Sequence, residues 1–133
     1  MKPPREPWFV ANEELDARMV EAMSGKDLSG VMSCFYRGPD LLAVRWGTEM
    51  HGTAEIRQAV ESLFNCCDTL KLSLDRIERV RSGDVVLAVG HATWTITTQG
   101  SVRTFCEVWT DVRRRVDGNW VYLLGHAEII PGA

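Results

Sequence analysis

The chain has 133 residues, of which 45% are apolar and 25% charged, and its formal net charge at neutral pH is −3. This size and composition are typical of one globular domain with its own core, so we expect a single domain over residues 1–133. The scattered basic residues argue against nucleic-acid binding, and no apolar stretch approaches the roughly 20 residues that span a bilayer.

The N-terminus, MKPPREPW, contains no apolar run typical of a secretory signal, and we expect residues 1–7 to form a flexible tail. The four cysteines and three histidines have no spacing typical of a metal site. We therefore expect no metal and no cofactor. Reduced cysteines and the missing signal favour a cytoplasmic location.

The first half of the chain predicts three helices and one strand. Apolar residues recur at helical spacing over residues 11–23, and Gly25 would end this helix. Asp27 would cap a short second helix, and LLAVRW is typical of a strand. Thr53 would cap the third helix. The buried side of that helix would consist of Ile56, Ala59, Val60, Leu63 and Phe64.

The second half predicts an antiparallel meander of four strands, at about residues 69–81, 85–98, 101–116 and 119–130. Sixteen extended residues would span about 53 Å. A domain of this size is only about 36 Å across, so the sheet must bend strongly, through bulges. The order of the elements predicts an α+β fold, in which the three helices cover the concave side of the sheet.

The turns QG and DG predict which strand residues pair. If Gln99-Gly100 and Asp117-Gly118 are two-residue loops, Trp109 lies opposite His126, and paired residues share a face. One extra residue in a strand would invert this assignment. The predicted face consists of Trp94, Glu107, Trp109, Asp111, Tyr122, Leu124, His126 and Glu128. We expect this face to line a cavity, and the more aliphatic opposite face to form a homodimer interface.

Two passages resemble the nuclear-transport-factor-2-like superfamily, especially its SnoaL-like and ketosteroid-isomerase-like branch. One runs from AMSGKDLSGVMSCFYRGPDLLAV into HGTAEIRQAV, and the other is the closing hairpin RVDGNWVYLLGHAE. The resemblance implies a cone-shaped α+β barrel with a pocket in its curved sheet, usually assembled as a homodimer through the sheets. It implies no single function, because this fold hosts many activities.

The catalytic residues of ketosteroid isomerases are only partly matched. Those enzymes use a Tyr and a protonated Asp as an oxyanion hole, and a second Asp as base. Asp111 falls where the oxyanion Asp would lie, whereas Met19 takes the tyrosine position and Arg45 or Trp46 the base position. The resemblance therefore does not imply steroid isomerisation.

Two functions remain open at this point. The first is a small-molecule-binding domain without catalysis, which holds an apolar ligand with a polar group in the concave pocket. The expected ligand contacts are Trp94, Glu107, Trp109, Tyr122, Leu124, Glu128, Met19 and Trp46. The second is a cofactor-free acid–base enzyme, an isomerase, polyketide-cyclase-like enzyme or hydratase, with Asp111 and His126 as catalytic groups.

Each candidate residue also has a structural interpretation. Asp111 would be desolvated beneath the helices, or would pair with Arg113 or Arg45. His126 would be a base oriented by a carboxylate, or a structural histidine bonded to an acid. Two further expectations concern charged groups at the surface. Glu107 and Glu128, placed opposite each other, would share a proton, be separated by an arginine, or meet at a solvated rim. The run Arg113–Arg115 would form the solvated end of a strand or, at most, an anion contact.

Overall fold

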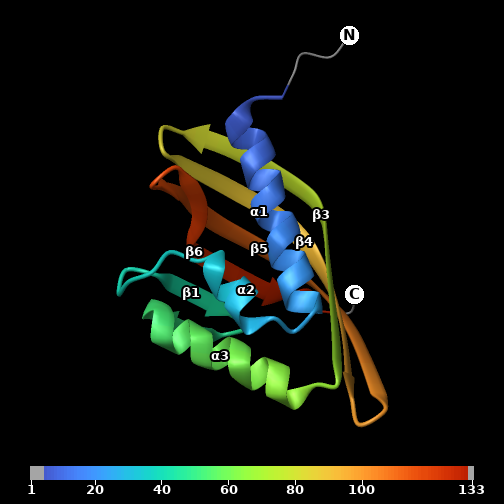
Figure 1. Cartoon of the computed structure of the whole chain (residues 1–133). Coiled ribbons are helices and arrows are strands. Elements are labelled where there is room, and N and C mark those ends of the chain that lie inside the picture. Colours follow the sequence, from blue (N-terminus) through green and yellow to red (C-terminus); the bar gives the residue numbers. More distant parts are fainter. Residues whose placement is uncertain (1–4, 132–133) are drawn as a thin grey trace.

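The computed structural model describes residues 5–131 as three helices and a six-stranded sheet (Figure 1). The helices are α1 (Pro7–Ser24), α2 (Leu28–Ser33) and α3 (Gly52–Cys66). The strands are β1 (Leu42–Arg45), β2 (Thr48–His51), β3 (Thr69–Ser82), β4 (Val85–Thr98), β5 (Ser101–Val116) and β6 (Asn119–Ile129). Their order in the sheet is β2-β1-β6-β5-β4-β3, antiparallel except between β1 and β6. This architecture confirms the predicted α+β fold; β2 was not predicted.

The sheet bends because two of its long strands contain bulges. In β3, the pairing with β4 shifts between Asp75 and Glu78. In β6, Leu123 is an extra residue, because Arg113 pairs with Tyr122 while the preceding residue of β5 pairs with Leu124. Bulges increase the local twist, so the sheet curves across α1 as the strand lengths predicted (Figure 1).

Helix α1 begins at Pro7, earlier than the apolar spacing indicated. Proline suits the first turn because its missing N–H has no helical partner there. Gly25 ends the helix, as predicted. Of the expected tail, residues 1–4 lie outside the described residues, and Arg5 forms an ion pair with Glu13 at 2.6 Å.

The two other helices differ in how they begin. The Asp27 carboxylate accepts a hydrogen bond from the backbone N–H of Gly30 at 3.0 Å, which confirms it as the cap of α2. The prediction that Thr53 caps α3 is wrong. Its hydroxyl instead accepts from the backbone N–H of Gly38 at 3.0 Å, and His51 takes the cap position without a side-chain bond.

The register of the β4–β5 hairpin is the predicted one along its whole length. Trp94 pairs with Phe105, and Gly90 pairs with Trp109. Gln99 and Gly100 form the loop, and both have positive φ, of 49° and 80°. This twist suits a two-residue hairpin loop, so the turn chemistry fixed the pairing.

The register of the β5–β6 hairpin is the predicted one only up to the bulge at Leu123. Beyond it every pair is displaced by one residue, so His126 lies opposite Thr110 and Glu128 lies opposite Val108. Because strand side chains alternate, the extra residue moves the following side chains to the convex face. The residues whose predicted face is wrong are Leu124, His126 and Glu128.

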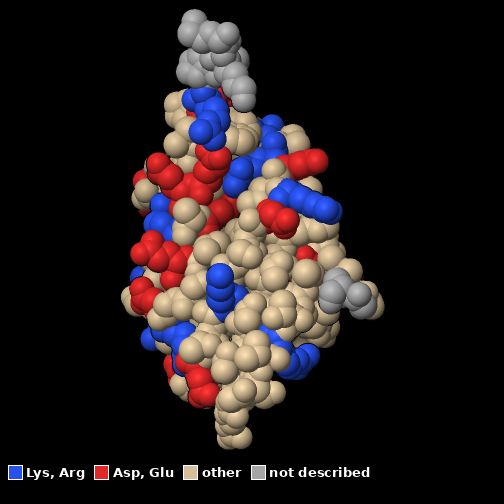
Figure 2. Space-filling model, turned by 90° about the vertical axis from the view of Figure 1, so that its right-hand side faces the viewer, with Lys and Arg blue, Asp and Glu red and all other residues tan. Residues whose placement is uncertain are grey.

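Two features of the structure concern membranes and nucleic acids. No helix within residues 5–131 is long and apolar enough to cross a membrane. On the face shown in Figure 2, acidic and basic side chains lie interspersed above a broad uncharged area. That face therefore offers no continuous basic patch of the kind that follows a nucleic-acid backbone.

Candidate functional site

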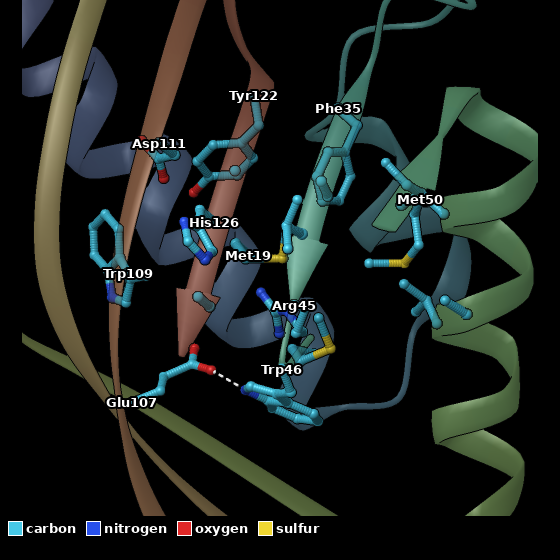
Figure 3. A pocket seen from close by; sticks show the side chains of 18 of the residues that line it. Met19, Phe35, Arg45, Trp46, Met50, Glu107, Trp109, Asp111, Tyr122 and His126 are labelled. Atoms are coloured by element: carbon cyan, nitrogen blue, oxygen red, sulfur yellow. Dashed lines mark hydrogen bonds between the residues drawn. The ribbon is translucent and has the colours of Figure 1, made fainter. Parts of the chain in front are cut away.

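A cavity of about 310 Å³ lies between the concave face of the sheet and the helices (Figure 3). Most of its wall is apolar, with Met19 and Met23 from α1, Leu63 from α3, and Leu72 and Trp94 from the sheet. The polar residues of the wall are Asp16, Arg45, Thr48, Glu107, Thr110, Asp111, Tyr122 and His126. An apolar hollow with a few polar groups is the usual form of a small-molecule site.

A buried ionic network closes one side of this cavity. The side chains of Asp16 and Arg113 are 6% and 0% exposed, and two guanidinium N–H groups of Arg113 donate to the Asp16 carboxylate at 2.9 and 2.8 Å. Arg79 donates to the same carboxylate at 2.7 Å, and the Tyr122 hydroxyl donates at 2.6 Å. Asp16 therefore ties α1 to three strands of the sheet, with the directionality of charge-assisted hydrogen bonds.

Asp111 belongs to the same network. Nε of Arg113 donates to Oδ1 of Asp111 at 2.7 Å, and Nη2 donates to Oδ2 at 3.3 Å. Burial raises the pKa of Asp111 from 3.8 to about 6, although the Arg113 charge opposes the shift. The structural interpretation in which Asp111 pairs with Arg113 is confirmed. The residue nevertheless lines the cavity with a carboxyl group that titrates near neutral pH.

The network also fixes the charge state of its other members. Burial works against the charged form of Arg113, but Asp111, Tyr122 and Asp16 together outweigh it and raise the arginine pKa. Burial, followed by the charge of Asp16, raises the pKa of Tyr122 well above 10. At neutral pH Arg113 is therefore a cation and Tyr122 a neutral donor.

The expected solvated end at Arg113–Arg115 is wrong for its first member. Arg113 is fully buried, because alternation along β5 puts it on the same face as Asp111, and Arg114 points to the opposite face. Arg115 shares the face of Arg113 but lies near the end of the strand, where it is exposed and pairs with Asp84. The basic run is thus divided between the two faces of one strand.

Glu107 lies in another part of the cavity wall and is only 2% exposed. Trp46, directly after β1, donates its indole N–H to Oε2 of Glu107 at 2.7 Å (Figure 3). The Trp46 ring packs edge-on against Trp94 and Phe105, at centroid distances of 5.9 and 5.3 Å. The solvated-rim interpretation of Glu107 is therefore wrong.

Trp109 contributes a flat aromatic surface to the wall. A Cβ placed on Gly90, its partner on β4, would lie 2.4 Å from Cζ2 of the Trp109 ring. Only a residue without a side chain lets the indole lie this close to the neighbouring strand.

His126 borders the cavity, but its side chain is not enclosed by it. The register puts the side chain on the convex face, where it is 51% exposed, and Nε2 lies 3.3 Å from Oε1 of Glu128. His126 therefore borders the pocket through its place on β6, while its imidazole is exposed to solvent. The expected enclosure of His126 with Asp111 is wrong, and its nearest acid is the exposed Glu128 on the same strand.

The structure brings together six of the eight predicted ligand contacts. They are Met19, Trp46, Trp94, Glu107, Trp109 and Tyr122, and Asp111 joins them. Leu124 and Glu128 do not line the cavity, because both follow the bulge and are exposed.

Sequence reasoning missed two charged residues of the network, Asp16 and Arg79, and it named Arg113 only as a partner of Asp111. One signal was present for Asp16, which lies four residues after Asn12 and three before Met19, on the helix face that is buried. A polar residue in such a stripe requires a buried partner. The spacing within the helix did not predict which residue of the sheet pairs with Asp16.

No three His, Cys, Asp or Glu side chains within residues 5–131 come together in a way that could hold a metal ion. The two carboxylates of the network, Asp16 and Asp111, are instead neutralised by the guanidinium groups of Arg79 and Arg113. The donor set therefore does not fit a divalent cation.

Residues 17–123 match the family model described as the SnoaL-like domain. No curated protein matches the chain. Among solved structures, it is similar to a "putative dehydratase from the NTF2-like family" of Streptomyces avermitilis, at 16% identity over 93% of this chain and 97% of that one, with a TM-score of 0.84. It is also similar to an NTF2-like superfamily protein of Salmonella enterica, at 15% identity over 93% of both chains and a TM-score of 0.84. A third is a "putative aromatic ring hydroxylase" of Novosphingobium aromaticivorans, at 16% identity over 95% of this chain and 92% of that one, with a TM-score of 0.83. At these identities the likeness concerns the fold alone.

Proposed function

Because the chain belongs to the SnoaL-like domain family, we propose that it binds a small, largely apolar molecule with one polar group in the concave cavity of its sheet. The cavity itself is the observation that carries this proposal. Its volume of about 310 Å³ lies at the lower end of the range for ligand pockets. The carboxyl groups of Asp111 and Glu107 stand in a wall that is otherwise mostly apolar, where they would orient the polar group of the ligand.

A cavity-filling variant tests this function. A Cβ on Gly125, in the cavity wall, would have no atom within 4 Å, so Gly125→Leu fills the hollow without a clash at its first carbon. We expect the wild type to bind 1-naphthalenemethanol in isothermal titration calorimetry, and Gly125→Leu to bind it at least about tenfold more weakly. Val108→Leu adds volume on the convex face of β5 and should bind like the wild type. No binding by the wild type, or unchanged binding by Gly125→Leu, would contradict the proposal.

An acid–base enzyme is the second candidate, and the pKa of Asp111 is the observation that favours it. A carboxyl group with a pKa of about 6 can both donate and accept a proton near neutral pH. The dehydratase name of the Streptomyces protein is in keeping with such chemistry. In this version Asp111 acts without His126, whose imidazole lies on the convex side.

We also propose that a second copy of the chain covers the convex face of the sheet. One row of directly paired residues crosses five strands there and is apolar throughout. The row consists of Val80, Leu87, Val112, Leu124 and Leu42. Three of its side chains are exposed, Val80 by 63%, Leu87 by 49% and Leu124 by 39%. A continuous apolar row suits a twofold interface in which each copy presents the same patch.

The cytoplasmic location stays a proposal that the cysteines support. Cys34, Cys66, Cys67 and Cys106 are all free thiols in the structure. Unpaired cysteines are typical of a reducing compartment.

A further inference from the structure

Glu107 is a buried carboxyl group with a hydrogen bond to only one of its two oxygens. Its Oε2 accepts from Nε1 of Trp46 at 2.7 Å, and residues 5–131 supply no hydrogen bond to Oε1. Figure 3 shows the second oxygen pointing into the pocket, away from Trp46. Oε1 is not among the fully buried side-chain atoms that lack a hydrogen bond, so it keeps an open side toward the cavity, where a ligand can reach it.

The neighbouring cations are engaged elsewhere. The Arg45 guanidinium lies over the rings of Trp46 and Trp94, 5.6 and 5.3 Å from their centroids. Within the described residues it forms no ion pair with Glu107. Arg113 is held by the two aspartates of the ionic network. The buried indole N–H groups of Trp94 and Trp109 have no partner within the described residues, but neither donates to Glu107, so the donor for Oε1 is left to what fills the cavity.

We propose that the ligand carries a hydroxyl or amino group whose hydrogen binds Oε1 of Glu107, an inference that rests on the proposed function. Trp46 holds the carboxyl group from its other side and keeps Oε1 directed into the pocket. Trp94 and Trp109 offer apolar surface to the body of the ligand. A ligand whose polar group only accepts hydrogen bonds would place its lone pairs against those of Oε1. Glu107 therefore selects ligands with a hydrogen-bond donor over ligands with an acceptor alone.

Three probes with one shared ring system test the selection. 1-Naphthalenemethanol has a hydroxyl donor, 1-(methoxymethyl)naphthalene keeps the oxygen but lacks its hydrogen, and 1-methylnaphthalene has no polar group. We expect the wild type to bind the alcohol at least about tenfold more tightly than the ether, by isothermal titration calorimetry. The ether should bind no better than the hydrocarbon.

The Glu107→Gln variant tests the residue itself. The glutamine carbonyl can still accept from Trp46, and its amide NH₂ then replaces Oε1 as a donor toward the cavity. We expect the preference for alcohol over ether to fall to about one, because the ether oxygen now has a partner. Glu128→Gln makes the same change on the exposed convex side and should keep the wild-type preference.

A second variant keeps the test decisive if Glu107→Gln fails to fold. Trp46→Phe removes the donor to Oε2 and leaves the carboxyl group free to turn, so the preference should weaken several-fold. The inference is overturned if the wild type binds alcohol and ether equally, or if neither Glu107→Gln nor Trp46→Phe changes the preference. Either result leaves the proposed binding of a small molecule in the cavity in place. Failure of all three probes, the hydrocarbon included, overturns the proposed function and this inference with it.

Discussion

The titratable chemistry of the cavity depends on one shared guanidinium group. Arg113 donates to both Asp16 and Asp111, so one buried cation serves two buried carboxyl groups, with Arg79 as a second donor to Asp16. Buried charges are tolerated in a protein interior only when each one is paired and hydrogen-bonded. Removing one partner therefore leaves the others unpaired. Asp111 still has a raised pKa within the group, because burial outweighs the Arg113 charge.

The raised pKa of Asp111 should make protein stability depend on pH. Its pKa is about 6 in the folded protein against an ordinary 3.8, so the folded state holds this proton more tightly than the unfolded chain. The stabilisation is fully present below the ordinary pKa and is lost as pH rises through the folded-state value, by about 3 kcal/mol. The difference in free energy of unfolding between wild type and Asp111→Asn should therefore fall between pH 4 and pH 7, in urea titrations. A difference independent of pH would contradict the shift.

The same variant separates the two candidate functions. Asn cannot exchange a proton near neutral pH, so Asp111→Asn would abolish turnover by an acid–base enzyme while leaving the fold intact. In a binding domain it would change only the affinity for the ligand.

For single residues, the sequence predicted which side chains of a strand share a face, but it did not predict which residues of distant elements pair. Alternation from Trp109 correctly placed Glu107 and Asp111 in the cavity wall. The partnership of Asp16 with Arg113 could not be predicted, because 97 positions separate them and no local pattern links a helix to a distant strand.

At the scale of elements, the wall formed by β4 and β5 depends on a missing side chain. Gly90→Ala would push a methyl group into the Trp109 ring, and overpacking of this kind costs about 1–3 kcal/mol. Gly125→Ala also adds a methyl group to the concave face, where a Cβ meets nothing within 4 Å, so its effect should stay within about 0.5 kcal/mol. Urea unfolding of both variants measures the difference. Equal changes in the free energy of unfolding for the two variants would contradict the prediction that the contact between Gly90 and the Trp109 ring leaves no room for a methyl group.

Elements with strong periodicity were predicted almost to their ends. The four long strands and the three helices follow from apolar spacing and turn residues. Strand β2 was missed because its four residues, TEMH, alternate in no consistent way and are mostly exposed. The parallel pairing of β1 with β6 was also unpredicted, because it joins strands far apart in the sequence.

At the scale of the whole molecule, the apolar row on the convex face predicts self-association. Leu87→Lys places a charge within the row, so we expect a dimer for the wild type and a monomer for this variant, in sedimentation velocity at micromolar concentration. Val102→Lys changes an exposed valine near the tip of the β4–β5 hairpin, outside the row, and should remain dimeric. A monomeric wild type would end the proposal of a sheet-to-sheet dimer.

The curvature of the sheet could be predicted by comparing the strand lengths with the diameter of the domain. The positions of the bulges could not be predicted in this way. Strands this long had to bend to fit a domain of this size. Where the bend falls depends on which residue leaves the ladder, and nothing in VYLLGH singles out Leu123.

That one unpaired leucine affects how relatives can be compared with this chain. An alignment anchored on the final turn transfers roles correctly only as far as Tyr122. From residue 124 onward the parity of inward and outward positions is reversed, so a relative with an unbroken ladder would point a different set of side chains into its interior. A single insertion or deletion there would thus exchange the side chains on the convex face of the terminal strand with those on its concave face.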